Sequence, residues 1–355
     1  MVRPFDGKRI LITGGTGSLG KVLVRRILHG EMGNPDKVIV FSRDEAKQHF
    51  MRVEYQHRAV ATDEVIYRNF QRTLQFQIGD IRDFNSVAAV LRDVDIVFNA
   101  AALKQVPTCE YFPYEGVMTN VMGAENIVRA IQAHNLPVET VVGISTDKAC
   151  KPVNVMGMTK AVQERIFIQG NMRCPGTRFV CVRYGNVLAS RGSVIPLFHD
   201  QIRHGGPVTI TTPEMTRFLL SLDDAVDTVF AVVRNGCPGE TYVPRAPSAL
   251  VQHIATALIG TREIEIEVTG IRPGEKLHEI MVSEEEAHRC AECGNWYAIL
   301  PMLPEICGER KGDQCLTKEY SSADTVMSLG ETVRLLIERR LMLEDVEREY
   351  TETLR

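Results

Sequence analysis

The sequence lacks the features that mark membrane proteins, secreted disulfide frameworks and nucleic-acid binders. No uninterrupted apolar run approaches the roughly 18 to 20 residues that a membrane-spanning helix needs, and no apolar signal segment precedes the first predicted strand. The net charge is −4 and the 41 basic residues are scattered, so no nucleic-acid surface is expected. We therefore expect a cytoplasmic protein without a membrane or nucleic-acid partner, whose nine cysteines are reduced thiols.

Apolar runs alternate with segments of helical spacing through the first half of the chain. Strands are predicted at residues 8–13, 37–41, 74–78, 95–98, 140–144 and 178–183. Strand–helix alternation of this kind predicts an α/β fold, a Rossmann-type doubly wound parallel sheet. Helices are expected at residues 44–60, 114–134, 222–234, 248–259 and 331–350, with short strands near 208–211, 241–243 and 264–268. The chain of 355 residues has no internal repeat.

A glycine-rich turn follows the first predicted strand, in the order Thr-Gly-Gly-Thr-Gly-Ser-Leu-Gly at residues 13–20. Glycines at such a turn let backbone N–H groups approach a diphosphate at a helix N-terminus, where the helix dipole favours negative charge. We therefore predict dinucleotide binding here. The expected cofactor contacts are Gly14, Thr16, Gly17, Ser18, Leu19 and Gly20.

The end of the second strand indicates which dinucleotide. A site selective for NAD would place an acidic residue here, whereas this chain has Ser42 and Arg43, with Lys47 a turn later. Arginine matches phosphate geometry, so NADP is favoured over the alternative that Arg43 is a solvated loop charge. Asp80, followed by Ile81, would contact the adenine amine, although helix capping at this point suits Asp83 better. The remaining cofactor contacts are expected at Ala100, Ala101, Lys104 and Lys160.

The stretch at residues 144–160 is expected to carry the chemistry. It follows the fifth strand, at the sheet edge where ligands bind in open α/β sheets. Asp147 and Lys148 form an acid–amine pair there, and Lys160 follows on a predicted helix. A surface turn is the alternative for the pair. Met156 stands four residues before Lys160, and a thioether cannot transfer a proton.

With these motifs the chain resembles the extended short-chain dehydrogenase/reductase superfamily, and within it the UDP-N-acetylglucosamine 4,6-dehydratases that invert C5. It looks most similar to the capsular-polysaccharide dehydratase/5-epimerase branch, which carries methionine instead of the tyrosine of Tyr-x-x-x-Lys. The resemblance covers nearly the whole chain. Its motifs lie at residues 13–20, 41–47, 99–107, 145–149, 183–187, 190–196, 215–218 and 272–276.

The resemblance implies a hydro-lyase for polysaccharide or glycan biosynthesis, with NADP as cofactor and a UDP-sugar as substrate. NADP+ would take hydride from C4, a base would remove the C5 proton, and an acid would protonate the C6 hydroxyl, which leaves as water. Hydride would then return from NADPH to C6 and a proton to C5, and arrival of that proton on the opposite face inverts C5. The product would be UDP-2-acetamido-2,6-dideoxy-β-L-arabino-hexos-4-ulose. It also implies a homo-oligomer, a hexamer in the family. Residues 1–185 would form the NADP-binding domain, and residues 186–355 mainly the smaller substrate-binding region, part of which returns to the sheet.

The resemblance also implies roles for single residues. Lys148 is assigned as the C5 base and Asp147 as the acid for the leaving hydroxyl, with Thr146 and Lys160 beside them. A free lysine has a pKa of about 10.4, so Lys148 must lose its proton. Lys160, the charged cofactor ring and desolvation would favour that loss. The expected substrate contacts are Lys104, Asn186, Arg191, Val194, Arg217, Arg272 and Glu275, although Arg217 and Arg272 could instead form structural salt bridges.

Two segments depart from the family pattern. Residues 56–73 look longer than in relatives and could be an oligomer contact or a longer loop. Cys290 and Cys293 resemble a zinc knuckle that Cys307 and Cys315 could complete, but a second Cys-x-x-Cys is missing. We favour reduced thiols and expect no metal.

Two other functions remain open. A nucleotide-sugar 4-epimerase shares the fold and cofactor, but would normally keep the tyrosine and needs no Asp–Lys pair. A catalytically inactive NADP-binding protein is the other possibility, which the intact Asp147, Lys148 and Lys160 disfavour. The sequence leaves open the nucleotide, the C2 substituent, the outcome at C5 and the group that takes the C4-hydroxyl proton.

Overall fold

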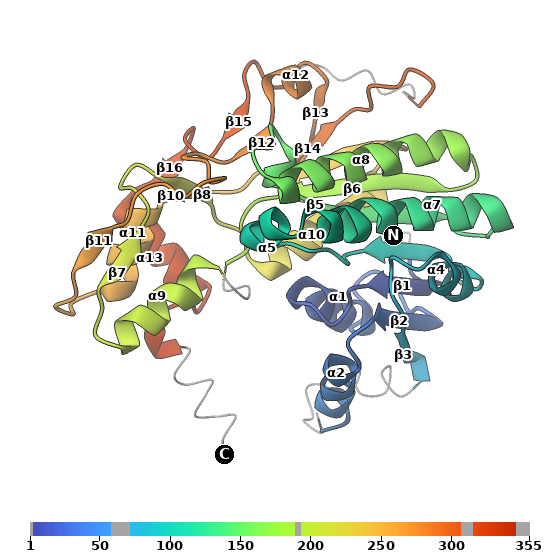
Figure 1. Ribbon diagram of the computed structural model, residues 1–355, viewed down its shortest axis with the longest axis horizontal. Coiled ribbons are helices and arrows are strands. Elements are labelled where there is room, and N and C mark those ends of the chain that lie inside the picture. The colour runs from blue at the N-terminus through green and yellow to red at the C-terminus, as the bar shows by residue number, and fades with distance from the viewer. Residues whose placement is uncertain (1–2, 58–71, 189–192, 307–314, 346–355) are drawn as a thin grey trace.

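A nine-stranded sheet organises the molecule (Figure 1). The structure, a computed structural model, describes residues 3–57, 72–188, 193–306 and 315–345. The strand order is β13-β14-β9-β6-β5-β4-β1-β2-β3. All pairs from β3 to β9 are parallel, whereas β14 runs antiparallel to β9 and to β13. The predicted doubly wound parallel sheet is therefore confirmed. Its strands are β1 (Arg9–Thr13), β2 (Lys37–Ser42), β3 (Leu74–Ile78), β4 (Ile96–Asn99), β5 (Thr140–Thr146), β6 (Arg178–Tyr184), β9 (Thr241–Pro244), β13 (Cys290–Cys293) and β14 (Trp296–Ile299).

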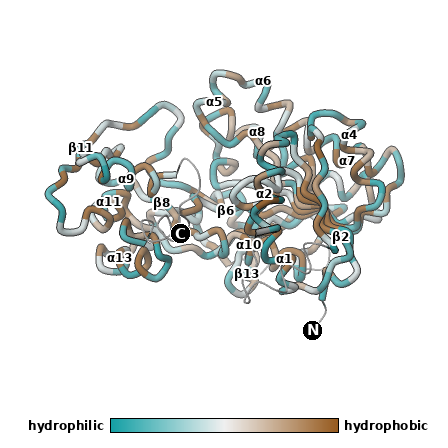
Figure 2. The backbone as a smooth tube through the Cα atoms, turned by 90° about the horizontal axis from the view of Figure 1, so that it is seen from below, coloured by the Kyte–Doolittle hydropathy of each residue, from teal (hydrophilic) through white to brown (hydrophobic). Residues whose placement is uncertain are grey.

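Successive side chains of each strand point to opposite faces of the sheet and pack into two separate hydrophobic cores, one on each face. Ile10 and Ile12 pack with α1 and α10, whereas Leu11 between them packs with α4, α7 and α8. Because both faces are covered, the strands are apolar on both sides, and Figure 2 shows them in brown between the helices. The layers are α1 (Ser18–Leu28) and α10 (Leu222–Asn235) on one face, and α4 (Phe84–Leu91), α7 (Gly123–His134) and α8 (Val155–Arg173) on the other.

A smaller α/β region with its own core lies beside the carboxyl ends of the parallel strands (Figure 1). It forms around α9, α11 and α13, a parallel pair of β7 and β11, and a three-stranded sheet in which β10 pairs parallel with β16 and antiparallel with β8. Its elements are α9 (Val194–Arg203), β7 (Val208–Ile210), β8 (Thr216–Phe218), β10 (Ser248–Leu250), α11 (Val251–Ile259), β11 (Ile266–Val268), β16 (Val326–Met327) and α13 (Leu329–Glu338).

Three predicted helices differ from those observed. The helix expected at residues 114–134 is continuous but contains a π-helical segment, so that α6 (Pro113–Gly116), η2 (Val117–Met122) and α7 follow one another. The helix expected from residue 248 begins only at Val251, because Ser248–Leu250 pairs with β8 as a strand. The last helix begins earlier than expected and ends at Glu338. The remaining elements are α2 (Glu45–His57), α5 (Val106–Tyr111), η3 (Asp147–Ala149), β12 (Ile280–Val282), α12 (Glu284–Ala287) and β15 (Tyr320–Ser321).

Residues 290–295, which resemble a zinc knuckle, form a strand and a turn, and the alternative that they bind zinc stays untested. Cys290–Cys293 is strand β13, paired along its whole length with β14 in a tight hairpin. Among residues 3–57, 72–188, 193–306 and 315–345, no cluster of three or more metal-ligating side chains is placed to hold an ion. Cys307, and most of the 56–73 stretch, lie outside these residues. In the same part of the chain, no helix is long and apolar enough to cross a membrane.

Candidate functional site

The glycine turn between β1 and α1 forms a cradle with no room for side chains. Gly14 has φ +65°, and a Cβ added there would lie 2.8 Å from the Ala101 backbone. Gly17 caps α1 at its N-terminus, and its N–H donates to the Gly14 carbonyl at 2.9 Å. The six cofactor contacts predicted at residues 14–20 therefore gather at one helix N-terminus, where N–H groups favour an anion.

The loop after β4 forms the opposite wall of this cradle. The Thr13 hydroxyl donates to Asn99 Oδ1 at 2.7 Å and accepts from the Ala101 N–H at 3.2 Å. These bonds hold Ala100 and Ala101 against the glycine turn. Lys104 follows in the loop before α5, where burial lowers its pKa.

Charged side chains surround the carboxyl ends of β2 and β3. Arg43 is 58% exposed, and its Nη1 lies 3.8 Å from Asp80 Oδ2. Asp80 also pairs with Arg82 at 2.7 Å, on the other side of Ile81 in the sequence. Lys47 pairs with Asp44 at 2.5 Å. Gln48 binds the Ser42 hydroxyl. The capping role assigned to Asp83 is confirmed, since its side chain accepts from the N–H groups of Asn85 and Ser86. An adenine contact by Asp80 stays a prediction.

Lys148 occupies the centre of the site, just beyond the end of β5. Its Nζ lies 3.2 Å from Asp147 Oδ1, 3.2 Å from Asn186 Oδ1 and 3.2 Å from Glu279 Oε1. Asp147 is only 1% exposed, and its Oδ1 also accepts from the Thr146 hydroxyl at 2.7 Å. The surface-turn alternative for this pair is therefore not what the structure shows.

The charge on Lys148 is stabilised rather than weakened by these neighbours. Desolvation by itself lowers the pKa of Lys148, but the negative charges of Asp147 and Glu279 outweigh it and raise that pKa above the usual value. Lys148 is therefore an ammonium ion in this arrangement. For the protein residues alone the direction is opposite to the expected lowering of the pKa, because two carboxylates surround Lys148 and Lys160 does not; the contribution expected from the charged cofactor ring stays a prediction.

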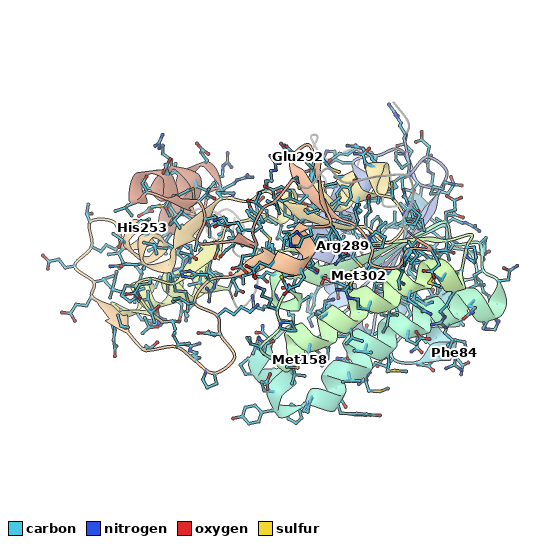
Figure 3. The ribbon with its side chains drawn as sticks, turned by 90° about the horizontal axis from the view of Figure 1, so that it is seen from above. Phe84, Met158, His253, Arg289, Glu292 and Met302 are labelled. Carbon is cyan, nitrogen blue, oxygen red and sulfur yellow. The ribbon has the colours of Figure 1, made fainter. Side chains whose placement is uncertain are left out.

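Lys160 lies behind β5, away from this cluster. Its Nζ donates to the Ile144 carbonyl and to Gln163 Oε1, both at 2.6 Å. Burial lowers the pKa of Lys160 to about 8. Met156, in the tyrosine position, is 4% exposed, whereas Met158 is 49% exposed at the start of α8 (Figure 3). The buried thioether supplies no proton donor.

The loop at residues 269–279 crosses from the smaller region onto the catalytic stretch. Lys276 Nζ donates to the Cys150 carbonyl at 2.5 Å, and Asn154 Nδ2 donates to the Gly274 carbonyl at 2.9 Å. Arg272 and Glu275 lie on this loop, and Glu275 Oε2 is 3.5 Å from the Thr211 hydroxyl. Predicted substrate residues are thus carried to the site by contacts with the catalytic stretch itself.

A buried ionic network supports the site from behind. Arg183 pairs with Glu164 and with Glu286, each at 2.7 Å, and all three side chains are nearly inaccessible. The Ser145 hydroxyl donates to Glu164 Oε1 at 2.5 Å. This network ties β5, β6, α8 and α12 together, and Ser145 lies two residues before Asp147.

The chain matches a known protein family over most of its length. A family model described as "Polysaccharide biosynthesis protein" matches residues 10–301. The chain belongs to the polysaccharide biosynthesis protein family. The finer placement, in the UDP-N-acetylglucosamine 4,6-dehydratase branch, stays a prediction.

Members of this family and related folds bear different functional names. A relative from Rickettsia typhi (strain ATCC VR-144 / Wilmington), named UDP-glucose 4-epimerase, is 42% identical over 348 residues, covering 94% of this chain and 96% of the relative. The X-ray structure of Pen from Bacillus thuringiensis has a TM-score of 0.83 at 31% identity, covering 95% of this chain and 99% of that chain. DesIV from Streptomyces venezuelae, a dTDP-glucose 4,6-dehydratase, has a TM-score of 0.63 at 23% identity, covering 76% and 86%. That last likeness shows the fold alone.

Not every predicted site residue of this family member reaches the lysine. Asp147, Lys148 and Asn186 meet there, with Arg217 nearby at 3.7 Å from Glu279. Arg217 Nη1 also binds the carbonyls of Thr216 and Leu277, so part of its role is structural. Val194 begins α9, and Arg191 lies outside the described residues.

Sequence reasoning missed Glu279, which is 3% exposed and touches Lys148 directly. It lies three residues beyond the 272–276 motif. A carboxylate so close to that motif could have been noted. Nothing in the sequence indicates that it contacts Lys148, which lies 131 residues earlier in the chain.

A cavity of about 250 Å³ lies elsewhere, between α10, α13 and the β13–β14 turn. None of the residues predicted to be catalytic lines it. Its lining includes Ser221, Asp224, Thr228, Arg245, Trp296 and Arg339.

Proposed function

We propose that this protein is an NADP-dependent UDP-N-acetylglucosamine 4,6-dehydratase that inverts C5, a hydro-lyase of polysaccharide biosynthesis. One observation carries the proposal. An acid–amine pair, Asp147 and Lys148, stands at the carboxyl end of β5, while the tyrosine position holds a buried methionine. Dehydration needs both an acid and a base at the sugar, and this pair supplies both.

The residues around the glycine turn fit a nicotinamide dinucleotide. A cradle that a single Cβ at Gly14 would fill, at the N-terminus of an eleven-residue helix, suits a diphosphate. Arg43, exposed at the end of β2, supports NADP over NAD because a guanidinium matches a 2′-phosphate. When bound, the cofactor supplies reversible hydride transfer. The solved DesIV and Thermus thermophilus UDP-glucose 4-epimerase structures contain NAD, so the choice of dinucleotide needs its own binding measurement.

The ion pair can generate both catalytic groups in one proton transfer. Lys148 Nζ lies 3.2 Å from Asp147 Oδ1, within hydrogen-bond reach. Moving one proton from the ammonium to the carboxylate leaves an amine that can take the C5 proton and a carboxylic acid that can protonate the C6 hydroxyl. After water leaves, Lys148 holds the C5 proton and Asp147 is again ionised, so the pair returns to its resting charge.

The substrate is proposed from the site and from its relatives together. Arg217 and Arg272 are cationic groups suited to a diphosphate. The names of the relatives concern UDP- and dTDP-sugars. The hexamer expected from the resemblance remains part of the proposal.

A second candidate is a nucleotide-sugar 4-epimerase, favoured by the name of relatives 42% identical to this chain. An epimerase needs one group to take the C4-hydroxyl proton. Lys148 could serve there, since Met156 cannot. An epimerase does not need the carboxyl group of Asp147 beside Lys148, and the presence of this group favours dehydration.

Mass spectrometry after incubation with UDP-N-acetylglucosamine and either dinucleotide tests the proposal. Loss of one water from the sugar supports the dehydratase, an isomer of unchanged mass supports the epimerase, and unaltered substrate supports an inactive binder. Repeating the reaction in deuterated water, with NMR of the product, reports exchange and configuration at C5. A C5 centre that keeps its configuration contradicts the inverting assignment.

A further inference from the structure

Glu279 is a buried carboxylate whose position is not explained by packing alone. It is 3% exposed, and its Oε2 has no hydrogen-bond partner among the described residues. Its other oxygen, Oε1, lies 3.2 Å from Lys148 Nζ and 3.7 Å from Arg217 Nε. A buried charge is costly unless it is paired, so this glutamate depends on the cations that it faces.

We propose that Glu279 is a positioning residue that sets the charge state of Lys148, the base assigned above. The inference rests on the proposed function. The Asp147–Lys148 pair needs only one carboxylate to exchange its proton. The second carboxylate stabilises the ammonium form, and thereby fixes how readily the proton leaves.

Other charges face the same cluster and must be included. Asp147 comes from η3, Arg217 from β8 and Lys276 from the loop that crosses the site, and each acts on the charge of Lys148 or of Glu279. Arg217 and Lys276 oppose the ammonium, while Asp147 and Glu279 favour it. Removing Glu279 alone therefore leaves two cations against one carboxylate, a change that favours the neutral amine.

The place of Glu279 on the loop at residues 269–279 links the charge of Lys148 to that loop. Glu279 is the last residue of the loop that carries Arg272 and Glu275, and its N–H donates to the Ser322 hydroxyl at 2.9 Å. That same loop is anchored on the catalytic stretch through Lys276. The charge of Lys148 is thus coupled to the docking of the segment predicted to bind substrate.

The test compares Glu279→Gln with wild type by two measurements across pH. The first is the pH dependence of product formation. The second is the rate of reductive methylation of Lys148, followed by peptide mass spectrometry, which reports the neutral amine and needs no turnover. Lys148 is partly accessible, with 24% of its side chain exposed, so a small reagent can reach it.

Replacing the carboxylate should move both Lys148 profiles toward lower pH by about one to three units, the usual effect of one close opposite charge. Glu279→Asp, which keeps the charge, should move them much less. Glu319→Gln removes the carboxylate that pairs with Lys151 at 2.6 Å, and should leave Lys148 unchanged.

The outcomes separate this inference from the proposed function. If Glu279→Gln slows catalysis equally at every pH and leaves the methylation profile in place, Glu279 is merely structural and the inference is overturned. If wild type yields no dehydrated product but the methylation profile shifts, the charge control stands and the dehydratase assignment fails.

Discussion

At the scale of single residues, the central finding is that Lys148 begins as a cation. A base must accept a proton, yet desolvation is outweighed by Asp147 and Glu279, which raise the pKa of Lys148. The proton can be released only if another group takes it, and Asp147 Oδ1 at 3.2 Å is within reach. In the proposed reaction, catalysis therefore depends on the pair rather than on the lysine alone.

Replacement of Lys148 by alanine is expected to lower kcat by about 10²- to 10⁴-fold, the usual contribution of a general acid or base. Binding of the dinucleotide should persist, because Lys148 contacts the cluster beyond β5 and not the glycine turn. Initial rates of product formation and a cofactor titration measure the two effects. Lys151→Ala, at an exposed neighbouring lysine paired with Glu319, is the matched control. A Lys148→Ala enzyme that works at the wild-type rate rules out the assigned role.

Much of this site could be predicted residue by residue, and the limit is physical. Asp147 and Lys148 follow a buried strand directly, so their place at the sheet edge follows from the chain itself. Glu279 could not be placed, because its contact with Lys148 is set by the packing of two regions. The position of Lys160 was also not foreseen, since its bond to the Ile144 carbonyl depends on how α8 packs on β5.

At the scale of elements, backbone geometry decides what the β1–α1 turn can accept. Gly7 and Gly14 have similar positive φ, +69° and +65°, but differ in their surroundings. Nothing lies within 4 Å of a Cβ at Gly7, whereas a Cβ at Gly14 meets the Ala101 backbone at 2.8 Å. Substitution of Gly7 therefore tests backbone strain alone, whereas substitution of Gly14 adds a steric clash to the same strain.

Gly7→Ala is expected to cost roughly 1 kcal/mol of stability, from the positive φ alone. Gly14→Ala should cost more, and should also weaken dinucleotide binding by widening the gap between the turn and Ala101. Thermal unfolding with and without cofactor measures both effects. Equal stability losses and equal cofactor-induced shifts in Tm for the two variants would contradict the cradle.

The buried network under the site should make stability depend on pH. Burial alone raises the pKa of Glu286, but the charge and hydrogen bonds of Arg183 dominate and lower it to about 2. A carboxyl whose folded pKa lies below its unfolded value of about 4.5 stabilises the protein above that value. This contribution is lost as pH falls from about 4.5 toward 2, by up to about 1.4 kcal/mol per pH unit.

Urea unfolding of wild type and Glu286→Gln at pH 7, 4 and 3 tests this dependence. The wild type should be the more stable protein at pH 7, and its advantage should shrink as the pH falls. Glu285→Gln, at an exposed neighbour on the same short helix, is the control and should show a much smaller change. An advantage over Glu286→Gln that stays constant down to pH 3 excludes the predicted contribution.

At the scale of the whole molecule, the parallel strands could be predicted from the sequence better than the contacts between segments that are distant in the chain. The parallel strands can be recognised from apolar runs and glycine turns, because both signals lie within a short stretch of sequence. The antiparallel addition of β13 and β14 and the strand at Ser248–Leu250 depend on distant partners, which spacing cannot indicate. The same is true of the contact that closes the site, where the loop at residues 269–279 meets the catalytic stretch.

That contact leads to a prediction about substrate binding. Lys276 Nζ donates to the Cys150 carbonyl at 2.5 Å, and half-burial lowers the pKa of this lysine. A hydrogen bond from a charged group is worth about 1.5 to 3 kcal/mol at most, and solvent reduces it here. Lys276→Met should therefore raise KM for the nucleotide sugar by about three- to tenfold while changing kcat less, because the loop carrying Arg272 and Glu275 docks less firmly. Lys318→Met, which removes an exposed lysine paired with Asp324, should leave KM unchanged. If Lys276→Met lowers kcat alone, the loop acts on the catalytic pair and does not position the substrate.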